Sequence, residues 1–344
     1  MEPLVSILIP AHNAARWVAD TLQSALDQTW ARKEIILIDD GSVDDTLVIA
    51  RRFSSDIVTI VGQEKQGAAA ARNRALALSK GEYIQWLDAD DILACDKIAK
   101  QLEQTKASSK RLLLSGAWGA FIYRRSKARF IRTPLWCDLS PVEWLSTKME
   151  QNHHMQTATW LVSRELTGLA GPWDVRLSLD DDGEYFCRVL LASSGVHFVR
   201  EAKVFYRAAS STSLRNVDGS NEKLESFFLS TQLHVQYLLS LENSERVRFI
   251  CLNYLQRRVR NFVPERPDLV HKIEKIAAHL GGRITSPELG GKYFFIERFV
   301  GYAAAKRSRS LLRRWKWSLI RSWDRALARL ESGKEDDHTR RGAN

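Results

Sequence analysis

The sequence predicts an α/β fold in three layers, with helices on both faces of a doubly wound, mostly parallel sheet, followed by an α-helical C-terminal region. Two near-continuous apolar runs, residues 4–9 and 34–38, are typical of parallel strands that are covered on both faces. Segments with helical periodicity separate and follow these runs, so strands and helices alternate up to residue 91. This alternation favours parallel strands joined by crossover helices.

The predicted elements follow one another in a regular order. After the first strand, Trp17, Leu22 and Leu26 recur with helical spacing. The next elements are a strand at 34–38, a helix opened by Asp44 or Asp45, a strand at 57–61, a helix at 67–78 and a strand from residue 83. Later strands are expected at 111–123, 196–199 and 204–206, and a short helix at 141–147.

The composition is that of a globular protein with an anionic partner. The 344 residues allow one large domain or two ordinary ones, and 44% of them are hydrophobic. The formal net charge of +10 points to a nucleotide, a nucleic acid or a membrane surface without choosing among them. Because Cys95, Cys137, Cys187 and Cys251 have neither zinc-site nor disulfide spacing, we expect reduced cysteines in a cytoplasmic protein. We expect no signal peptide and no membrane-spanning helix.

The most informative segment is 83–91, a short apolar run that ends in the carboxylates of Asp88, Asp90 and Asp91. Open α/β sheets bind ligands at this carboxyl edge. Carboxylates a few Å apart repel by about 4 kcal/mol per pair, and a divalent cation relieves that repulsion. We therefore expect magnesium or manganese bound with a nucleotide diphosphate. The alternative is a solvated acidic turn in which Asp91 caps a helix beginning near Leu93.

Two other nucleotide-binding classes lack their glycine-rich loops in this sequence. A Rossmann fold requires G-x-G-x-x-G in the turn after the first strand, where this chain has P-A-H-N-A-A. Without glycines, that turn does not let a pyrophosphate approach the backbone closely. A sugar-phosphate nucleotidyltransferase would need a G-G-x-G-x-R loop there, which is also absent.

Four motifs stand in order within residues 5–91. They are V-S-I-L-I-P-A-H-N at 5–13, E-I-I-L-I-D-D-G-S-V-D-D-T at 34–46, G-A-A-A-A-R-N-R-A at 67–75 and G-E-Y-I-Q-W-L-D-A-D-D at 81–91. Together they resemble the family 2 glycosyltransferases with the GT-A fold. The resemblance implies an inverting transferase that uses a nucleotide sugar, usually a UDP-sugar, and a D-x-D motif for Mn²⁺ or Mg²⁺.

The resemblance also implies roles in donor binding. Pro10, Ala11 and Asn13 would line the nucleotide pocket. Asp40 would accept a hydrogen bond from the base, and Asp39 is the near alternative.

Further roles follow for the arginine and acids of the last two motifs. Arg72 would approach the nucleotide, although a solvated helix charge is its alternative interpretation. Asp88 would contact the ribose or the metal, and Asp90 would ligate the metal directly. For Asp91, helix capping is favoured over metal ligation.

A second acidic cluster, L-S-L-D-D-D-G-E-Y-F-C-R at 177–188, begins a predicted helix whose N-terminal end stabilises carboxylates. Aligned on Glu184 and Arg188, it resembles the family's E-D-x-(D/E)-hydrophobic-x-x-R motif, which holds the catalytic base. Asp182 then takes the place of the base, and Asp181 stands where the family usually has glutamate. Because of this departure and the extra Asp180, the choice between Asp181 and Asp182 stays open, with Asp182 favoured. The other interpretation is an acidic helix start that serves as an N-cap.

In the family, the region that corresponds to residues 152–163 faces the acceptor. His153, His154 and Gln156 could contact sugar hydroxyls there, but a surface loop is the preferred interpretation of the two adjacent histidines. Trp160 and Trp173 could stack on a sugar ring, although core packing is the commoner use of tryptophan at such positions.

The last third of the sequence predicts helices only, at 224–241, 245–263, 269–280 and 302–330. In the last of them, leucines and tryptophans recur at helical spacing among many basic residues. Such a basic amphipathic helix suits peripheral adsorption to an anionic membrane, beside a lipid-linked acceptor. Packing of the leucine face on the catalytic domain explains the pattern equally well. Nucleic-acid binding is disfavoured because the aromatic residues follow the apolar stripe.

These expectations divide the chain into a GT-A domain at 1–215, a helical C-terminal region at 216–332 and a disordered tail at 333–344. The implied function is transfer of a sugar from a nucleotide sugar to a hydroxyl of a saccharide or lipid-linked acceptor. By the resemblance, this step belongs to bacterial surface polysaccharide or glycolipid synthesis, in the cytoplasm at the inner face of the cell membrane. The competing interpretation is a non-catalytic nucleotide-sugar-binding or membrane-tethering module.

Overall fold

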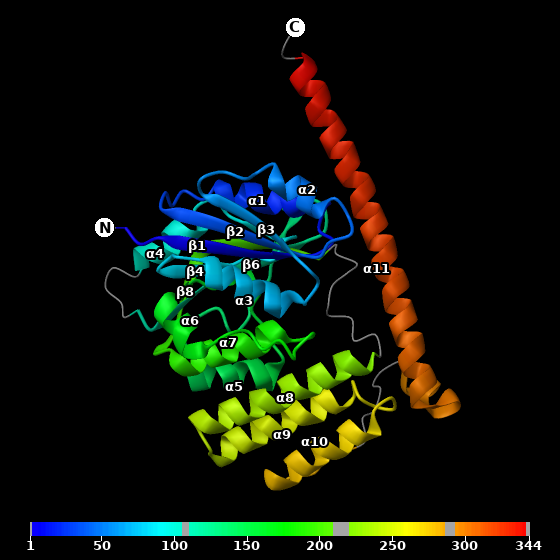
Figure 1. The fold of residues 1–344 in the computed structure, drawn as a ribbon. Coiled ribbons are helices and arrows are strands. Elements are labelled where there is room, and N and C mark those ends of the chain that lie inside the picture. Colours follow the sequence, from blue (N-terminus) through cyan, green and yellow to red (C-terminus); the bar gives the residue numbers. More distant parts are fainter. Residues whose placement is uncertain (1, 105–109, 209–219, 286–292, 342–344) are drawn as a thin grey trace.

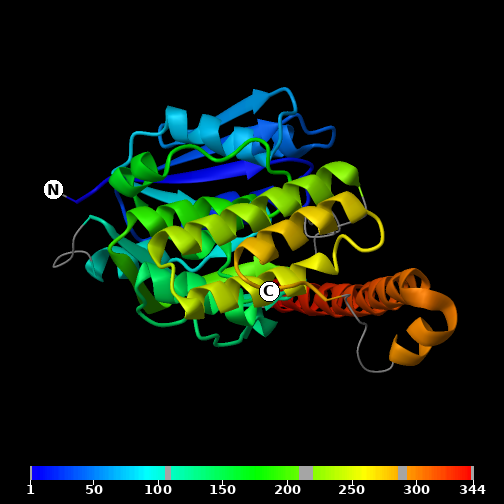
Figure 2. The same ribbon diagram turned by 90° about the horizontal axis from the view of Figure 1, so that it is seen from below.

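The computed structural model describes residues 2–104, 110–208, 220–285 and 293–341. Figure 1 shows an α/β part, a group of helices packed against it and one long helix, α11, that runs along one side. In the view turned by 90°, α8 to α10 cover one face of the α/β part and α11 extends to the side (Figure 2). The expected fold class is confirmed, because a mostly parallel sheet between helices precedes a helical C-terminal region.

The central sheet has the strand order β3-β2-β1-β4-β8, in which β1 to β4 run parallel and β8 runs antiparallel. The strands are β1 Val5–Ala11, β2 Lys33–Asp40, β3 Val58–Gln63, β4 Tyr83–Trp86 and β8 Val162–Ser163. In this register Ala11 pairs with Asp39, and Leu8 pairs with Trp86. The residues that follow β1, β2 and β4 therefore meet at one edge of the sheet.

Both faces of this sheet are covered by helices. They include α1 Val18–Leu26, α2 Thr46–Arg51 and α3 Ala68–Leu78. Ile7 and Ile9 of β1 lie in one core cluster with Leu22 of α1, whereas Leu8 lies in another with Ala71 of α3. Successive residues of β1 are thus buried on opposite faces, which explains the continuous apolar run in the sequence.

The second sheet has the order β5-β9-β6-β7. Its strands are β5 Ile92–Leu93, β6 Leu112–Phe121, β7 Arg129–Phe130 and β9 Gly195–Arg207. β6 and β9 are parallel, and the two short strands pair antiparallel at the edges. The two strands expected at 196–199 and 204–206 are one strand, whose pairing with β6 shifts register between Gly116 and Ala117.

The helix expected near Leu93 is wrong. Residues 92–93 form β5, and the helix α4, Lys97–Glu103, begins only after Asp96. Asp91 therefore caps no helix.

The remaining helices before α11 pack on one another and on both sheets. They are α5 Pro141–Gln151, α6 Arg164–Ala170, α7 Asp181–Ala192, α8 Asn221–Leu241, α9 Glu245–Val259 and α10 Pro267–His279. The start of α5 is stabilised by a capping box between Ser140 and Glu143. Because α8 packs on α7 and α9 packs on α5, the helical region supports the helix that carries the second acidic cluster.

The last helix, α11 Tyr293–Arg341, is broken at Gly301, whose φ of 80° is not helical. It starts before and ends after the segment expected at 302–330, and it continues into the tail from residue 333 that we expected to be disordered. Within the described residues, no helix has both the length and the apolar character needed to cross a membrane. The domain boundary predicted at residues 215–216 falls in 209–219, outside the described residues.

Candidate active site

Asn13 ties together the two turns that follow β1 and β2. It has a left-handed backbone with a φ of 50°, which asparagine tolerates better than most residues. Its backbone N–H donates to Ser42 Oγ at 2.9 Å, and its Oδ1 accepts from the N–H of Val43 at 2.9 Å. Pro10 and Ala11 end β1 directly before this turn. The three residues predicted to line a nucleotide pocket therefore lie at the carboxyl edge of the sheet.

The two acids that end β2 are buried and bonded within the protein. Asp39 accepts from the hydroxyl of Ser42 at 2.5 Å. Asp40 accepts from Gln63 Nε2 at 2.7 Å and from the backbone N–H groups of residues 66–67 at 2.8 Å. A carboxylate has about four acceptor positions, so three bonds leave Asp40 one more. Asp40 holds the loop that leads from β3 into α3.

Arg72 of α3 joins the two acidic clusters. Its terminal nitrogens lie 2.8 Å from Asp88 Oδ1 and 2.6 Å from Asp181 Oδ2. The side chain is only 7% exposed, so the alternative of a solvated helix charge is wrong. Although burial alone would lower the pKa of Arg72, the two carboxylates raise it, and Arg72 is charged. The acids after β4 and the acids at the start of α7 thus face one another across a single guanidinium.

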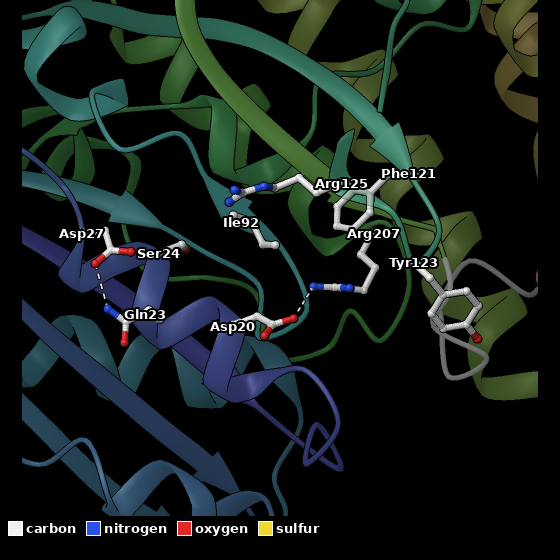
Figure 3. Close-up of a pocket in the computed structure, with 9 residues that line it drawn as sticks. All are labelled: Asp20, Gln23, Ser24, Asp27, Ile92, Phe121, Tyr123, Arg125 and Arg207. Carbon is white, nitrogen blue, oxygen red and sulfur yellow. Dashed lines mark hydrogen bonds and ion pairs between the residues drawn. The ribbon is translucent and has the colours of Figure 1, made fainter. Parts of the chain in front are cut away.

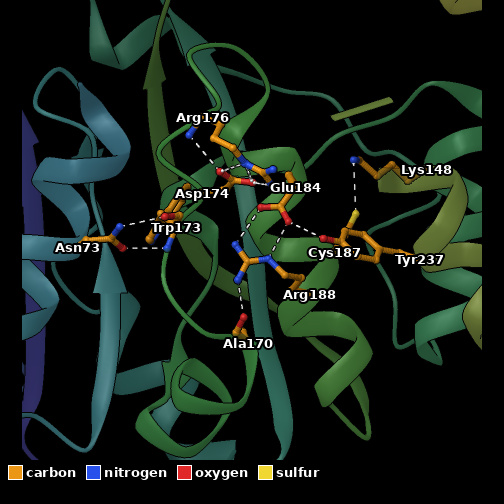
Figure 4. Close-up of polar contacts among 10 residues, drawn as sticks. All are labelled: Asn73, Lys148, Ala170, Trp173, Asp174, Arg176, Glu184, Cys187, Arg188 and Tyr237. Carbon is orange, nitrogen blue, oxygen red and sulfur yellow. Dashed lines mark hydrogen bonds and ion pairs between the residues drawn. The ribbon is translucent and has the colours of Figure 1, made fainter. Parts of the chain in front are cut away.

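Trp173 supports the position of Arg72. The guanidinium lies over its ring, 4.4 Å from the centroid, and the other face of the indole system packs among core aromatics, with Tyr185 nearly parallel at 4.0 Å. Asn73 fixes the backbone of Trp173 with two hydrogen bonds of 2.8 and 2.9 Å (Figure 4). Trp160 and Trp173 are each 1% exposed, so core packing is the correct interpretation of both.

Asp181 and Asp182 are adjacent at the start of α7 but differ in burial. Asp181 is 8% exposed, and burial raises its pKa to about 6, although the Arg72 guanidinium opposes the rise and nearby acids add to it. Asp182 is only partly buried, accepts from the next backbone N–H at 2.8 Å and lies 3.4 Å from the Thr157 hydroxyl. Asp182 is therefore the more accessible carboxylate of the pair.

Asp180 faces the helical region rather than Arg72. It has a left-handed backbone with a φ of 62°, and its Oδ2 lies 3.1 Å from Ser230 Oγ and 3.6 Å from a terminal nitrogen of Arg258. A Cβ on Gly183 would lie 2.2 Å from Asp180 Oδ1, so this arrangement needs glycine at 183. Asp180 anchors the start of α7 on α8 and α9.

The rest of the second motif forms an ion pair behind the site. Arg188 contacts both carboxylate oxygens of Glu184 at 2.7 and 2.8 Å, and the Tyr237 hydroxyl donates to the same carboxylate at 2.7 Å (Figure 4). Arg188 also donates to the Ala170 carbonyl. These contacts join α7 to α6 and α8 and hold the acidic start of α7 in place.

Asp91 is fully buried and connects three distant segments. Its Oδ1 accepts from the N–H of Arg207 at 2.8 Å, its Oδ2 accepts from Gln156 Nε2, and its carbonyl accepts from the Thr21 hydroxyl at 2.8 Å. Its role is structural, but it differs from the capping role that we expected. Gln156 is 2% exposed, so its side chain belongs to this buried network instead of an acceptor surface.

The two histidines of this region lie nearer the surface. His153 is partly exposed and His154 is exposed, with its ring 5.3 Å from that of Trp118. Their placement agrees with the preferred interpretation as a surface loop.

Arg207, the last residue of β9, is a site residue that sequence reasoning missed. Its Nε donates to the Asp90 carbonyl at 2.8 Å, and a terminal nitrogen pairs with Asp20 at 2.9 Å. These partners are 117 and 187 residues away in the sequence. No local motif marks such a contact, so no signal in the sequence could have found it.

Arg207 also lines a cavity of about 310 Å³ beside the acidic strand (Figure 3). The other lining residues come from α1 and the residue after it, from β5 and β6, and from the segment after β6: Asp20, Gln23, Ser24, Asp27, Ile92, Phe121, Tyr123 and Arg125. None of the predicted site residues lines this cavity. Arg207, which donates to the Asp90 carbonyl, connects it to the acids after β4, and the cavity is separate from the predicted donor site.

Asp88 and Asp90 suit a divalent cation. Asp88 contacts Arg72 through Oδ1, its side chain is 31% exposed, and Asp90 is partly exposed two residues later. Mg²⁺ and Mn²⁺ take such oxygen ligands and commonly bind one or two carboxylates together with substrate phosphates. In the described ranges, no group of three or more His, Cys, Asp or Glu side chains forms a metal site by itself. The two acids fit a cation whose other ligands come from a bound diphosphate.

Comparison with solved structures identifies the class of fold. The chain resembles residues 1–349 of TarS from S. aureus in complex with UDP, with a TM-score of 0.57 and 14% identity over 81% of this chain and 86% of that one. It also resembles the mannosyltransferase PcManGT from Pyrobaculum calidifontis in complex with GDP-Man and Mn²⁺, with a TM-score of 0.51 and 16% identity over 94% and 85%. The fold is the GT-A fold of glycosyltransferases.

Sequence comparison relates the first half of the chain to a known family. Residues 6–167 match the glycosyl transferase family 2 model. The putative teichuronic acid biosynthesis glycosyltransferase TuaG of Bacillus subtilis is 41% identical over 105 residues, which are 30% of this chain and 42% of TuaG. WfaP of Escherichia coli, a UDP-Glc:alpha-D-GlcNAc-diphosphoundecaprenol beta-1,3-glucosyltransferase, is 45% identical over 100 residues, 29% of this chain and 40% of WfaP. Residues 6–167 therefore resemble glycosyl transferase family 2, as the four motifs indicate, and the chain matches about two fifths of the length of these relatives.

Proposed function

We propose that the chain is an inverting glycosyltransferase that moves a sugar from a nucleotide sugar to a hydroxyl group of a saccharide or lipid-linked acceptor. The observation that carries this proposal is the position of Arg72, 2.8 Å from Asp88 and 2.6 Å from Asp181. It brings acids suited to a metal-bound diphosphate and acids suited to proton abstraction into one site. An inverting transfer needs this proximity, because leaving group and base act on opposite sides of the same anomeric carbon.

The proposed donor is a UDP-sugar. WfaP is named for a UDP-Glc donor, and TarS has been solved with UDP and with UDP-GlcNAc. PcManGT was solved with GDP-Man, so GDP-mannose is the natural comparison compound in an assay.

In this proposal Pro10, Ala11 and Asn13 line the nucleotide pocket. Asp40 accepts an N–H of the base at the acceptor position that its three protein bonds leave. Asp39, bonded to Ser42, shapes the same turn.

Arg72 and the first acidic cluster serve the phosphate end of the donor. Asp88 contacts the ribose or the cation, and Asp90 ligates the cation. A divalent cation held there supplies positive charge where negative charge develops on the departing diphosphate. Arg72 adds a fixed positive charge and keeps Asp88 oriented.

Asp182 is the proposed catalytic base. Its carboxylate takes the proton of the acceptor hydroxyl while that oxygen forms a bond to the anomeric carbon. The bond from this carbon to the diphosphate oxygen breaks, and the nucleoside diphosphate leaves with the electron pair. The ion pair of Asp181 with Arg72 supports this choice, because it leaves the more accessible Asp182 for the substrate. Positioned proton transfer of this kind contributes about 10² to 10⁴ in rate.

We place the reaction in the assembly of a bacterial surface polysaccharide or glycolipid, on the cytoplasmic side of the cell membrane. The names of TuaG and WfaP support this assignment. The competing proposal, a non-catalytic nucleotide-sugar-binding or membrane-tethering module, predicts donor binding without turnover.

A donor screen tests the proposal. Purified protein is incubated with each of several UDP-sugars, or with GDP-mannose, in the presence of Mn²⁺, Mg²⁺ or a chelator, and nucleotide release and thermal stability are measured. We expect one donor to give metal-dependent nucleotide release and to raise the unfolding temperature, because a ligand of the native state stabilises it. Stabilisation without any release, with or without candidate acceptors, would instead support the non-catalytic module.

A further inference from the structure

α11 presents a row of large apolar side chains to solvent. The row consists of Leu311, Leu312, Trp315, Leu319, Trp323 and Leu330, which are 51–70% exposed, and we call it the outer face of α11. The three- and four-residue steps between most of its members place them on one side of the helix. Large exposed apolar patches mark interaction sites in soluble proteins. The outer face is therefore a docking surface that needs a partner.

The opposite side of α11 is fixed to the catalytic domain. Asp324 Oδ2 accepts from the N–H of Tyr123 at 2.9 Å, and Asp324 Oδ1 lies 2.8 Å from Arg124 Nε. Glu331 pairs with the same arginine at 2.8 Å, and Arg325 donates to the Tyr123 hydroxyl at 2.7 Å. With these contacts formed, the apolar row points away from the domain. The expectation that the leucine face packs on the catalytic domain is therefore not met by this row.

The charge of α11 indicates the kind of partner. Between residues 302 and 331 the sequence has only two acids, Asp324 and Glu331, and both are paired with Arg124. The basic residues whose side chains are described are Lys306, Arg307, Lys316, Arg321, Arg325 and Arg329. The side chains of Arg309, Arg313 and Arg314 are outside the description. The helix thus combines an exposed apolar row with an excess of positive charge.

We propose that α11 binds the surface of an anionic membrane, with its axis in the membrane plane and the outer face among the lipid headgroups. Trp315 and Trp323 suit this position, because indole rings favour the boundary between headgroups and acyl chains. Basic side chains beside the apolar row would contact lipid phosphates. A second copy of this chain is a poorer partner, because two helices with this excess of positive charge repel each other.

This docking would orient the catalytic site. Tyr123, which α11 contacts, follows β6, and its ring lies 5.8 Å from that of Trp17, in the segment after β1. The membrane-bound helix therefore stands beside the carboxyl edge that holds the candidate active site (Figure 1). The benefit for a lipid-linked acceptor rests on the proposed function, whereas membrane binding itself does not.

Vesicle sedimentation tests the inference on the full chain. The vesicles are phosphatidylcholine alone or phosphatidylcholine mixed with phosphatidylglycerol. The test variant carries Trp315→Ser and Trp323→Ser, and the control carries Phe249→Ser, which removes a side chain of similar exposure, 63%, on α9. We expect the wild type and the control to bind the mixed vesicles, and the test variant to bind at least about tenfold more weakly, because membrane affinity follows buried apolar area.

A variant with fewer positive charges measures the electrostatic contribution to membrane binding. Lys316→Gln with Arg329→Gln should weaken binding to the mixed vesicles by about fivefold per charge removed and should change binding to neutral vesicles little. Equal binding of the wild type and the Trp315/Trp323 variant would overturn the proposal. So would a concentration-dependent dimer, seen by analytical ultracentrifugation, that this variant abolishes, because a second copy would then occupy the outer face.

Nucleotide release without vesicles keeps this test apart from the test of catalysis. Both α11 variants should release nucleotide from a soluble donor at the wild-type rate, since none of the changed residues lies at the candidate active site. If no variant, including the wild type, released nucleotide, the proposed function would fail while the sedimentation result still stood.

Discussion

The acidic cluster after β4 and the acidic cluster at the start of α7 use their three carboxylates in the same way, although one follows a strand and the other begins a helix. In each cluster one acid pairs with Arg72, namely Asp88 after β4 and Asp181 at the start of α7. A second acid belongs to the framework, Asp91 in the first cluster and Asp180 in the second. Asp91, at the edge of a sheet, is fully buried. The side chain of Asp180, at the start of a helix, is 21% exposed.

The third acid of each cluster, Asp90 or Asp182, is partly exposed, and these are the residues proposed for the cation and for the base. The comparison teaches that sequence position alone does not decide which acid reacts. The framework takes one carboxylate for packing and one for the shared arginine, and the remaining one is the partly exposed acid that we propose faces the substrate. Changing each kind of acid in turn tests this division.

The largest effect is expected for Asp182→Asn. The amide cannot accept the acceptor proton, so kcat should fall by about 10² to 10⁴ while the donor dissociation constant stays close to that of the wild type. Nucleotide release and donor-induced thermal shift measure the two quantities. Asp174→Asn, which changes an acid whose partner is Arg176, serves as the matched control and should keep normal turnover. Wild-type turnover in Asp182→Asn, or a greater loss in Asp181→Asn, would transfer the base role.

The next largest effect is expected for Arg72→Met. Removal of the guanidinium leaves Asp181 buried without its partner and should lower the free energy of unfolding by about 3–5 kcal/mol. Urea unfolding measures it. Adding Asp181→Asn should restore part of the stability, because the uncompensated charge is then gone. If the losses of unfolding free energy in Arg72→Met and in Asp181→Asn simply added up in the double variant, the two residues would not act as a pair.

Replacing the two framework acids, Asp91 and Asp180, should lower the free energy of unfolding by different amounts. Asp91→Ala leaves the N–H of Arg207 and the Gln156 amide without their acceptor in a buried setting, which should cost about 2–4 kcal/mol. Asp180→Ala should cost less, about 1 kcal/mol, because its partners Ser230 and Arg258 interact with a carboxylate that is partly exposed. Equal losses in urea unfolding would contradict the contrast between the sheet edge and the helix start.

A smaller effect is expected for Asp90→Asn. The loss of one charged oxygen ligand should raise the Mn²⁺ concentration needed for half-maximal nucleotide release by about tenfold or more. The unfolding free energy without metal should change little, in contrast to Asp91→Ala. A metal titration of activity measures the first quantity, and an unchanged Mn²⁺ requirement would remove Asp90 from the metal site.

The smallest effect concerns pH. The folded-state pKa of Asp181, about 6, lies above its ordinary value, so between the two values the folded protein binds more protons at this residue than the unfolded chain does. The contribution of Asp181 to stability therefore decreases as the pH rises through this window. We expect Asp181→Asn to remove this part of the pH dependence, which urea unfolding from pH 4 to pH 7 measures. An identical pH slope in the wild type and the variant would show that the carboxyl titrates normally.

Much of the fold could be predicted because it depends on local patterns. Apolar runs and helical periods located β1 to β4 and the helices between them, and parallel pairing then brought Asp39, Asp40 and Asp88 to one edge. The motifs also selected Arg72 and the acids at 181–182, which the structure brings together.

The remainder depends on contacts between distant segments. β5 is a two-residue strand that pairs with β9, more than a hundred residues later, so the sequence around Asp91 looked like the start of a helix and not like a buried connection. The contacts of Arg207 with Asp90 and Asp20 also join residues that are far apart in the sequence, so no local pattern could predict them. The amphipathic pattern of α11 is compatible with packing or exposure, and the contacts of Asp324, Arg325 and Glu331 with the catalytic domain decide which way the apolar row points.

The break at Gly301 has a mechanical consequence. On its C-terminal side, Ala305 is fully buried and Lys306 holds the Val263 carbonyl at 2.6 Å, so the first turns are clamped to the helical region. From Lys306 onward the helix is continuous. Each added or deleted residue therefore changes its length by about 1.5 Å and turns the later side chains by about 100° around the helix axis. A single insertion between Lys306 and Leu311 would therefore turn every later side chain of α11 by about 100°, while the residues of the candidate active site stayed in place.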